Sequence, residues 1–182
     1  MTFRFAACLA LVVPLLSACG GAVQRPDGGE GLLPVGAHAP EVVGKAADGS
    51  PVALSTSRGH AAVVYFYPKD ATPGCTKEAC AFRDAFKAYE ARQVTIFGVS
   101  RDSEEIHQDF RAQHALPFPL VSDADGAVAR AYGVPSPMGM SSRVTFLVGP
   151  DGKIARVWPD VDPGVHAREV LTAAEASLSA AK

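Results

Sequence analysis

The chain has 182 residues, 48% of them hydrophobic, which is enough to bury the core of one ordinary domain without metal or disulfide cross-links. Its 17 Lys and Arg residues and 19 Asp and Glu residues give a formal net charge of −2. Proteins that bind nucleic acids or coat anionic membranes are usually strongly basic, so this balance argues against both kinds of partner. The four cysteines, at positions 8, 19, 75 and 80, form two separated groups, which is not the arrangement of a disulfide framework.

Residues 1–18 have the composition of an export signal. A single charge, Arg4, precedes an apolar run at residues 5–16, and small residues then lead to Cys19. The run is shorter than the roughly 20 apolar residues that span a bilayer, and Pro14 would interrupt a helix of the folded domain. Residues 16–19 resemble the cleavage box of bacterial lipoproteins, in which the cysteine receives a lipid. We therefore expect a signal peptide at residues 1–18, lipidation of Cys19, and an exported protein anchored to a membrane and facing the periplasm or the outer side of the cell membrane.

Residues 19–36 are dense in glycine and proline and lack apolar periodicity. Such a segment buries too little surface to order itself, which predicts a flexible tether between the anchor and the domain. No internal repeat or second long apolar segment follows, so residues 37–182 are expected to form one domain.

The first half of that domain alternates strand and helix patterns. Short apolar stretches on both sides of residues 47–50 suggest a small leading hairpin, and the continuous β-rich run at residues 61–67 is typical of a central strand covered on both faces. Phe82, Phe86 and Tyr89 then recur at helical spacing and predict a helix over residues 76–92. A strand at residues 94–99 and a helix with Ile106 and Phe110 turned inward are expected next.

The second half is predicted to add a strand near residues 120–121, a helix at 127–132, a hairpin formed by residues 144–148 and 153–158, and a C-terminal helix from about residue 163. Strands that alternate with helices, together with one antiparallel hairpin, indicate an α/β domain with a central mixed sheet flanked by helices.

The segment between the strand at 61–67 and the following helix carries two cysteines. The strand ends at Tyr67 and the helix is expected to start near Cys75, with Cys80 five residues later. Free amides and the dipole at a helix N-terminus favour an anion, so this position favours the thiolate of Cys75. Because a thiolate is the nucleophilic form of cysteine, Cys75 is the candidate nucleophile.

These residues match a known family. The pattern Pro68-x-x-x-Thr72-x-x-Cys75 resembles the active-site signature of the peroxiredoxins, and Cys80 five residues after Cys75 resembles the bacterioferritin-comigratory-protein, or Q-type, subfamily. Arg143, which opens the strand at 144–148, extends the resemblance, which covers most of residues 32–178.

The resemblance implies a thioredoxin-like fold and a thiol peroxidase that needs no cofactor. Cys75 would attack the peroxide and become a sulfenic acid, while Thr72 and Arg143 position the peroxide and Pro68 shields the sulfur from water. Cys80 would then close a disulfide with Cys75 inside one chain, which a thioredoxin-type reductant reopens. The implied partners are a peroxide substrate and that reductant, and the chain is expected to be a monomer or a weak dimer.

Helix geometry adds a requirement to this scheme. Residues five apart on an intact helix have Cα atoms about 8.7 Å apart, whereas a disulfide needs roughly 4.4 to 6.8 Å. The first turns of the helix must therefore unwind for Cys80 to reach Cys75.

Two other classes of protein use a pair of cysteines, but with a different spacing. A thiol-disulfide reductase of similar fold uses Cys-x-x-Cys, and a copper-delivery protein of the thioredoxin fold uses Cys-x-x-x-Cys with a distant histidine, whereas four residues separate the pair in this chain. The five histidines show no metal-ligand spacing. The role of Glu78 stays open between a favourable first-turn carboxylate and, as the resemblance suggests, an orienting partner for an arginine.

Overall fold

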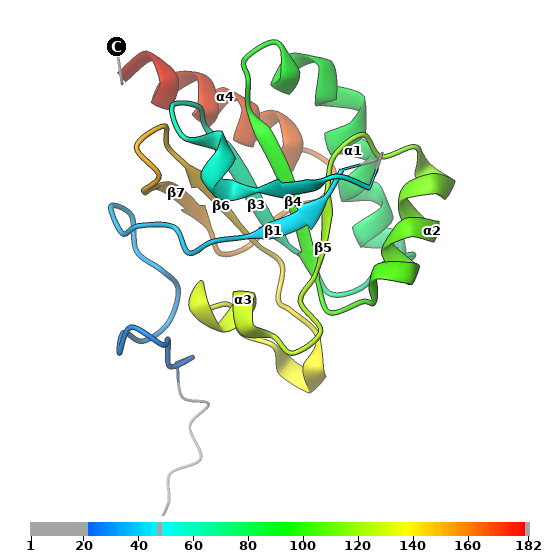
Figure 1. Ribbon diagram of the computed structural model, residues 1–182, viewed down its shortest axis with the longest axis horizontal. Helices are drawn as coiled ribbons and strands as arrows, with labels where there is room; N and C mark the ends of the chain where they lie inside the picture. Colours follow the sequence, from blue (N-terminus) through cyan, green and yellow to red (C-terminus); the bar gives the residue numbers. More distant parts are fainter. Residues whose placement is uncertain (1–21, 47–48, 181–182) are drawn as a thin grey trace, which may run out of the picture.

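A computed structural model describes residues 22–46 and 49–180. The expected signal peptide and Cys19 lie outside these residues. Within the described residues, a single mixed sheet of seven strands runs through the molecule, with helices packed against it (Figure 1). None of the helices in this part of the chain is long and apolar enough to cross a membrane.

The strands lie in the order β2-β1-β5-β4-β3-β6-β7 across the sheet, with β3, β4 and β5 mutually parallel and the other pairs antiparallel. The expected leading hairpin is formed by β1 and β2, and the expected second hairpin by β6 and β7. The α/β class and the mixed sheet are confirmed. The strand bounds are β1 Val43–Lys45, β2 Pro51–Ala53, β3 Ala62–Phe66, β4 Thr95–Ser100, β5 Leu120–Ser122, β6 Val144–Val148 and β7 Ile154–Trp158.

Four α-helices and two short 3-10 helices connect these strands within the described residues. Helix α1 begins at Pro73 rather than near residue 76, because a proline is well tolerated in the first helical turn, where amide groups lack partners. The early start makes Cys75 the third residue of the helix. The helix bounds are α1 Pro73–Glu90, α2 Glu104–His114, α3 Ala127–Ala131 and α4 His166–Ala180, with 3-10 turns at Leu54–Ser57 and Pro137–Gly139.

Strand β3 is buried on both faces, as its continuous apolar run predicts. Val63 and Tyr65 pack into the core that holds the inner sides of α1 and α4. Val64 and Phe66 point to the opposite face, where α3 and the segment before β1 cover the sheet. This central position fixes the end of β3, from which the cysteine loop leaves.

Helix α2 has Phe110 buried, as predicted, but its orientation differs from the prediction at Ile106. Ile106, expected to point inward, is 44% exposed, while His107 and Phe110 are buried. His107 takes the inward place because its ring nitrogen Nδ1 meets the buried carboxylate of Asp70 at 2.6 Å. Apolar periodicity alone could not reveal a buried polar pair of this kind.

Part of the segment expected to be a tether belongs to the folded domain. Leu33 is 3% exposed and packs into the core on the α3 side, and its amide donates to the carbonyl of Tyr132. The Arg25 guanidinium donates to the carbonyls of Glu30 and Gly31, which closes residues 24–30 into a turn. The expected tether therefore ends before residue 36, because its last residues belong to the folded domain. Backbone and side-chain hydrogen bonds order this segment although it lacks apolar periodicity.

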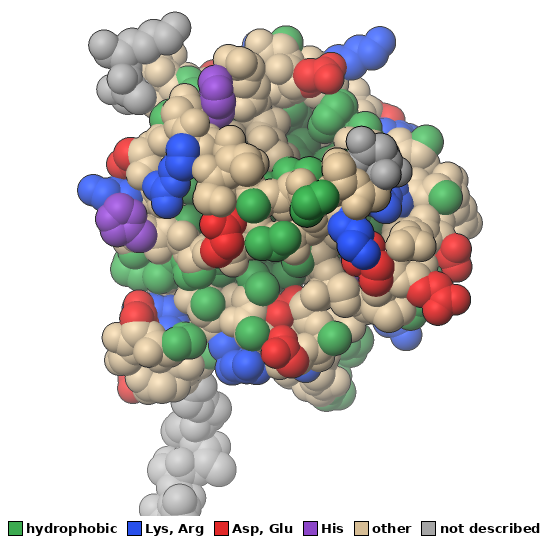
Figure 2. All heavy atoms as spheres, in the orientation of Figure 1, with side chains coloured by type: hydrophobic (Ala, Val, Ile, Leu, Met, Phe, Trp, Pro, Cys, Tyr) green, Lys and Arg blue, Asp and Glu red, His purple; other side chains and the backbone are tan. Residues whose placement is uncertain are grey.

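Figure 2 shows one face of the molecule, on which acidic and basic side chains are interspersed. No block of one sign covers this view of the described residues, as expected for a formal net charge of −2.

Candidate active site

Cys75 lies at the N-terminal end of α1, directly beyond the end of β3. Its side chain is 2% exposed and carries a free thiol. Thr72 is the N-cap residue and Pro73 the first residue of the helix, so Cys75 stands in the first turn, where the helix dipole and unpaired amides favour an anion. The local sequence thus places the candidate nucleophile where its thiolate is stabilised.

Arg143 reaches Cys75 through the pairing of β3 with β6. The antiparallel register sets Phe66 opposite Val144, so the residue before β6 lies beside the loop that follows β3. The Nη2 group of Arg143 donates to the Cys75 sulfur at 3.2 Å. The structure therefore brings together two of the predicted site residues that are 68 positions apart in the chain.

Glu78 is the second partner of Arg143, which settles the question left open by the sequence. The Nη1 group of Arg143 donates to the Glu78 carboxylate, which lies one turn after Cys75 on α1 and is 1% exposed. Burial raises the pKa of Glu78 to about 7, although the nearby Arg143 acts in the opposite direction. Burial lowers the pKa of Arg143, but Glu78 and Cys75 outweigh it and raise that pKa overall. The guanidinium thus stays charged while its two arms hold a carboxylate and the sulfur.

Thr72 and Pro68 frame the loop before the helix. The Thr72 hydroxyl donates to the carbonyl of Lys69 at 3.0 Å, and the Thr72 carbonyl accepts from the amide of Thr76. Pro68 is half-buried and follows the last buried residue of the β3 run, Tyr67. Both residues lie where the sequence predicts, next to the start of α1, and their roles toward a peroxide stay predictions.

A buried polar network holds the same loop and was not found from the sequence. The Asp70 carboxylate accepts from the Tyr67 hydroxyl at 2.7 Å and meets His107 Nδ1 at 2.6 Å, while the Asp70 amide donates to Asp102 at 2.9 Å. Between Asp70 and Thr72, Ala71 has a φ of 58°, a left-handed conformation that is uncommon for alanine. The hydrogen bonds on Asp70 stabilise this strained turn. A histidine at an inward position of a helix was the available signal in the sequence.

Cys80 lies on the same helix, half-buried and also a free thiol. Helix α1 is continuous from Pro73 to Glu90, so the two cysteines keep the helical separation of about 8.7 Å between Cα atoms. The Cys80 sulfur lies 4.0 Å from Nδ1 of His114, at the end of α2. The structure is therefore that of the reduced protein, in which a disulfide between the two thiols requires local unwinding.

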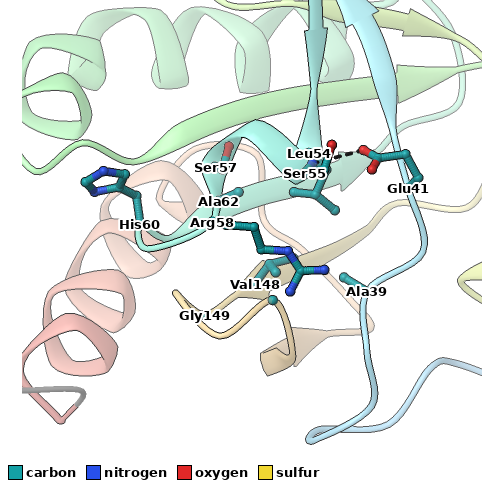
Figure 3. A pocket seen from close by; sticks show the side chains of 11 residues that line it. Ala39, Glu41, Leu54, Ser55, Ser57, Arg58, His60, Ala62, Val148 and Gly149 are labelled. Atoms are coloured by element: carbon teal, nitrogen blue, oxygen red, sulfur yellow. Dashed lines mark hydrogen bonds between the residues drawn. The ribbon is translucent and has the colours of Figure 1, made fainter.

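A small pocket at the other end of the sheet is separate from this site (Figure 3). Ala62, the first residue of β3, and Val148, the last residue of β6, line it together with Arg58. A Glu41 carboxylate oxygen at its rim accepts a hydrogen bond from the Ser55 amide at 3.0 Å. Because Cys75 follows the opposite end of β3, this pocket has no direct access to the thiol.

Comparison with known proteins identifies the family of this chain. The family model described as AhpC/TSA matches residues 35–157, and the chain belongs to the AhpC/TSA family. Its relatives within that family include peroxiredoxins of the Bcp and Q types. A putative peroxiredoxin Bcp of Coxiella burnetii is 40% identical over 146 residues, which cover 76% of this chain and 97% of that protein.

Solved structures of similar proteins agree with this family assignment. The bacterioferritin comigratory protein of Xanthomonas campestris, a structure that concerns alkyl peroxide reduction, superposes with a TM-score of 0.67 at 37% identity and covers 74% of this chain and 90% of its own. The peroxidoxin BcpB of Mycobacterium tuberculosis superposes with a TM-score of 0.70 at 32% identity and covers 78% and 96%, respectively. The thioredoxin-like peroxiredoxin fold expected from the sequence is confirmed, and the chain is a thiol peroxidase, an oxidoreductase.

Proposed function

We propose that Cys75 is the peroxidatic cysteine and Cys80 the resolving cysteine of this peroxidase. The observation that carries the proposal is the contact between Arg143 and the Cys75 sulfur at a buried helix N-terminus. Both features favour the thiolate, and the same guanidinium can stabilise negative charge that moves onto a peroxide oxygen. Cys80 is the nearest other cysteine in the sequence and lies on the same helix.

The reaction follows in three steps. The Cys75 thiolate attacks the terminal oxygen of hydrogen peroxide or an organic hydroperoxide, the O–O bond breaks, and water or an alcohol leaves while the sulfur becomes a sulfenic acid. The Cys80 thiolate then attacks this sulfur, and hydroxide leaves and is protonated to water as the disulfide forms. A dithiol of the thioredoxin type reduces the disulfide by exchange and becomes oxidised itself.

The alternative functions explain less of the site. A thiol-disulfide reductase gives no role to the Arg143–Glu78 pair or to the Thr72 position. A copper-delivery protein gives no role to the pattern Pro68-x-x-x-Thr72-x-x-Cys75.

Steady-state peroxide turnover with thioredoxin, thioredoxin reductase and NADPH tests the two cysteine roles. Cys75→Ser should abolish turnover, whereas Cys80→Ser should consume about one peroxide per chain and then stall or become over-oxidised, because attack and resolution are separate steps. Cys8→Ser is the matched control and should retain full turnover, because Cys8 lies in the expected signal peptide. Full turnover by Cys75→Ser contradicts the assignment.

We further propose that the peroxidase is an exported lipoprotein anchored through Cys19. The support is in the sequence alone: an apolar run, small residues before the cysteine, and only Cys75 and Cys80 left for redox chemistry after processing. One acyl chain binds membranes only marginally, so stable attachment needs the several chains of a lipoprotein. Outside the cytoplasm, turnover then requires an exported thioredoxin-like donor, because thioredoxin and NADPH are absent there.

Membrane fractionation with metabolic fatty-acid labelling of the native protein and of Cys19→Ala tests the anchor. The native protein should be labelled and sediment with membranes, and Cys19→Ala should lose the label. An unlabelled native protein found in the soluble cytoplasmic fraction contradicts the anchor without affecting the peroxidase assignment.

A further inference from the structure

The two thiols of α1 have different electrostatic surroundings. Cys75 has the helix N-terminus and Arg143, whereas Cys80 is the eighth residue of a helix that begins at Pro73, beyond the first turn to which the dipole effect is confined. Resolution nevertheless requires a thiolate at Cys80, because a thiol does not attack a sulfenic sulfur efficiently. Some other group must therefore take the proton of Cys80.

Two side chains beside Cys80 have the chemistry for this task. Nδ1 of His114, the last residue of α2, lies 4.0 Å from the Cys80 sulfur. Arg83, one turn after Cys80 on α1, donates from Nη1 to the carbonyl of His114 at 3.0 Å and so ties the end of α2 to α1. Figure 1 shows these two helices in the same part of the molecule.

We propose that His114 is the general base of the resolving step, with Arg83 stabilising the thiolate that forms. This inference rests on the proposed function and adds a catalytic residue to it. The proton of the Cys80 thiol passes to Nδ1 of His114, and the thiolate attacks the Cys75 sulfenic acid after the first turns of α1 unwind. The S–O bond breaks, the S–S bond forms, and the leaving hydroxide takes a proton from water or from the His114 imidazolium. The net change is one thiol and one sulfenic acid converted to one disulfide and one water.

The charges around His114 fit this role. The C-terminal end of α2 stabilises a positive charge on the imidazole. From α1, His114 faces Cys80 and Arg83, and Arg83 is in turn paired with Asp84. From α2 itself, the Arg111 guanidinium is directed to the carbonyls of residues 45 and 46. Hydrogen bonding to Asp84 raises the pKa of Arg83, and the nearby Cys80 acts in the same direction, so this cation persists at any working pH.

The ring is also held in place. The Phe110 ring meets the His114 ring edge-on, with 4.9 Å between centroids, which limits the orientations of the imidazole. His114 and Cys80 are both half-buried, so a proton can leave to solvent once it has been transferred. A general base of this kind typically contributes about 10²- to 10⁴-fold to a rate.

A single-turnover experiment on the whole chain tests the proposal. The reduced protein is mixed with one equivalent of hydrogen peroxide, quenched with acid at millisecond intervals and alkylated. Peptide mass spectrometry then quantifies the Cys75 sulfenic acid and the Cys75–Cys80 disulfide. The variants are His114→Asn, His114→Ala and, as a matched control, His60→Asn, because His60 lies just before β3 at the opposite end of the sheet.

His114→Asn should form the sulfenic acid at the native rate but close the disulfide at least about tenfold more slowly at mildly acidic pH. The deficit should shrink as the pH rises, because hydroxide in solution then removes the thiol proton without a protein base. Added imidazole should accelerate closure in His114→Ala, and His60→Asn should match the native protein throughout.

Closure at the native rate in His114→Asn at every pH overturns the proposal. A deficit that is constant with pH and unaffected by imidazole also overturns it, because that result indicates a structural role. Absence of any Cys75–Cys80 disulfide in the native protein contradicts the proposed function itself, so the two failures are distinguishable.

Discussion

At the scale of single residues, the site depends on one guanidinium that serves two partners. Arg143 holds the Cys75 sulfur with one arm and the buried Glu78 carboxylate with the other. A lysine offers a point charge rather than a planar fork and cannot reproduce both contacts. The two contacts explain why an arginine occupies the position before β6.

Loss of Arg143 should therefore slow the first chemical step. We expect Arg143→Ala to reduce the rate of sulfenic acid formation by orders of magnitude, each corresponding to about 1.4 kcal/mol of transition-state stabilisation, and Arg143→Lys to recover only part of it. Thr72→Val should also slow this step, because its hydroxyl is predicted to position the peroxide. Stopped-flow measurement with a sulfenic acid probe gives the rates, and circular dichroism checks that the variants fold. Native rates in both Arg143→Ala and Thr72→Val would show that the site is misplaced.

The raised pKa of Glu78 predicts a specific dependence of stability on pH. The folded state binds the Glu78 proton up to about pH 7, whereas the unfolded chain releases it near 4.5, so this group lowers the stability progressively as the pH rises between those values. The full contribution is about 3 kcal/mol. Glu78→Gln should remove this slope, which urea unfolding at several pH values measures. An unchanged slope in Glu78→Gln would contradict the assignment.

The sequence predicts some of these residues better than others. Cys75 could be located because a strand, a proline and a helix follow one another in the chain around it. The contact between Glu78 and Arg143 could not be derived, because it joins residues 65 positions apart and depends on the register of β3 with β6. The pairing of Asp70 with His107 was missed because the two residues are 37 positions apart and meet only when α2 packs beside the loop that follows β3.

At the scale of elements, α1 must be stable enough to hold Cys75 and labile enough to release Cys80. Its inner side is anchored by Phe82 and Tyr89, which lie after the two cysteines and are buried in the core with α4. Before these anchors, the turns between Cys75 and Cys80 place only the small side chains of Cys75 and Ala79 in that core, so they can unwind while the rest of the helix stays packed.

A glycine between the two cysteines should therefore accelerate disulfide formation. Lys77 is exposed, and Lys77→Gly weakens the helix by up to about 1 kcal/mol, which corresponds to roughly a fivefold faster closure where unwinding limits the rate. Lys87→Gly, at an exposed position of the same helix between Phe82 and Tyr89, is the matched control and should leave closure unchanged. Quenched-flow alkylation measures both rates. Equal acceleration by the two variants would contradict local unwinding.

Element boundaries followed from the sequence where apolar periodicity was strong, as in β3 and in the body of α1. The inward face of a helix was predicted less well where a polar contact determines it. The inward position on α2 belongs to His107 rather than Ile106, because a buried carboxylate supplies a partner for the imidazole.

At the scale of the whole molecule, the folded domain extends further toward the N-terminus than its composition indicates. Leu33 fills the core on the α3 side of the sheet, and the backbone around it bonds to the ends of α3 and β7. Any tether to the membrane therefore ends well before residue 36.

Leu33→Ala should lower the free energy of unfolding by about 2 to 5 kcal/mol, because it leaves a cavity in a packed core. Val35→Ala is the matched control, since Val35 is 64% exposed, and it should change stability by no more than about 0.5 kcal/mol. Chemical denaturation of both variants gives the comparison. An effect of Leu33→Ala as small as that of Val35→Ala would restore the longer tether.

The measurement that tests the central claim most directly is peptide mapping of the native protein after reduction and exposure to one equivalent of hydrogen peroxide. We predict loss of the free thiols of Cys75 and Cys80 together and the appearance of one peptide pair joined by a Cys75–Cys80 disulfide within a single chain. Consumption of the peroxide with Cys75 still a free thiol, or with Cys75 joined to a cysteine other than Cys80, would contradict the account.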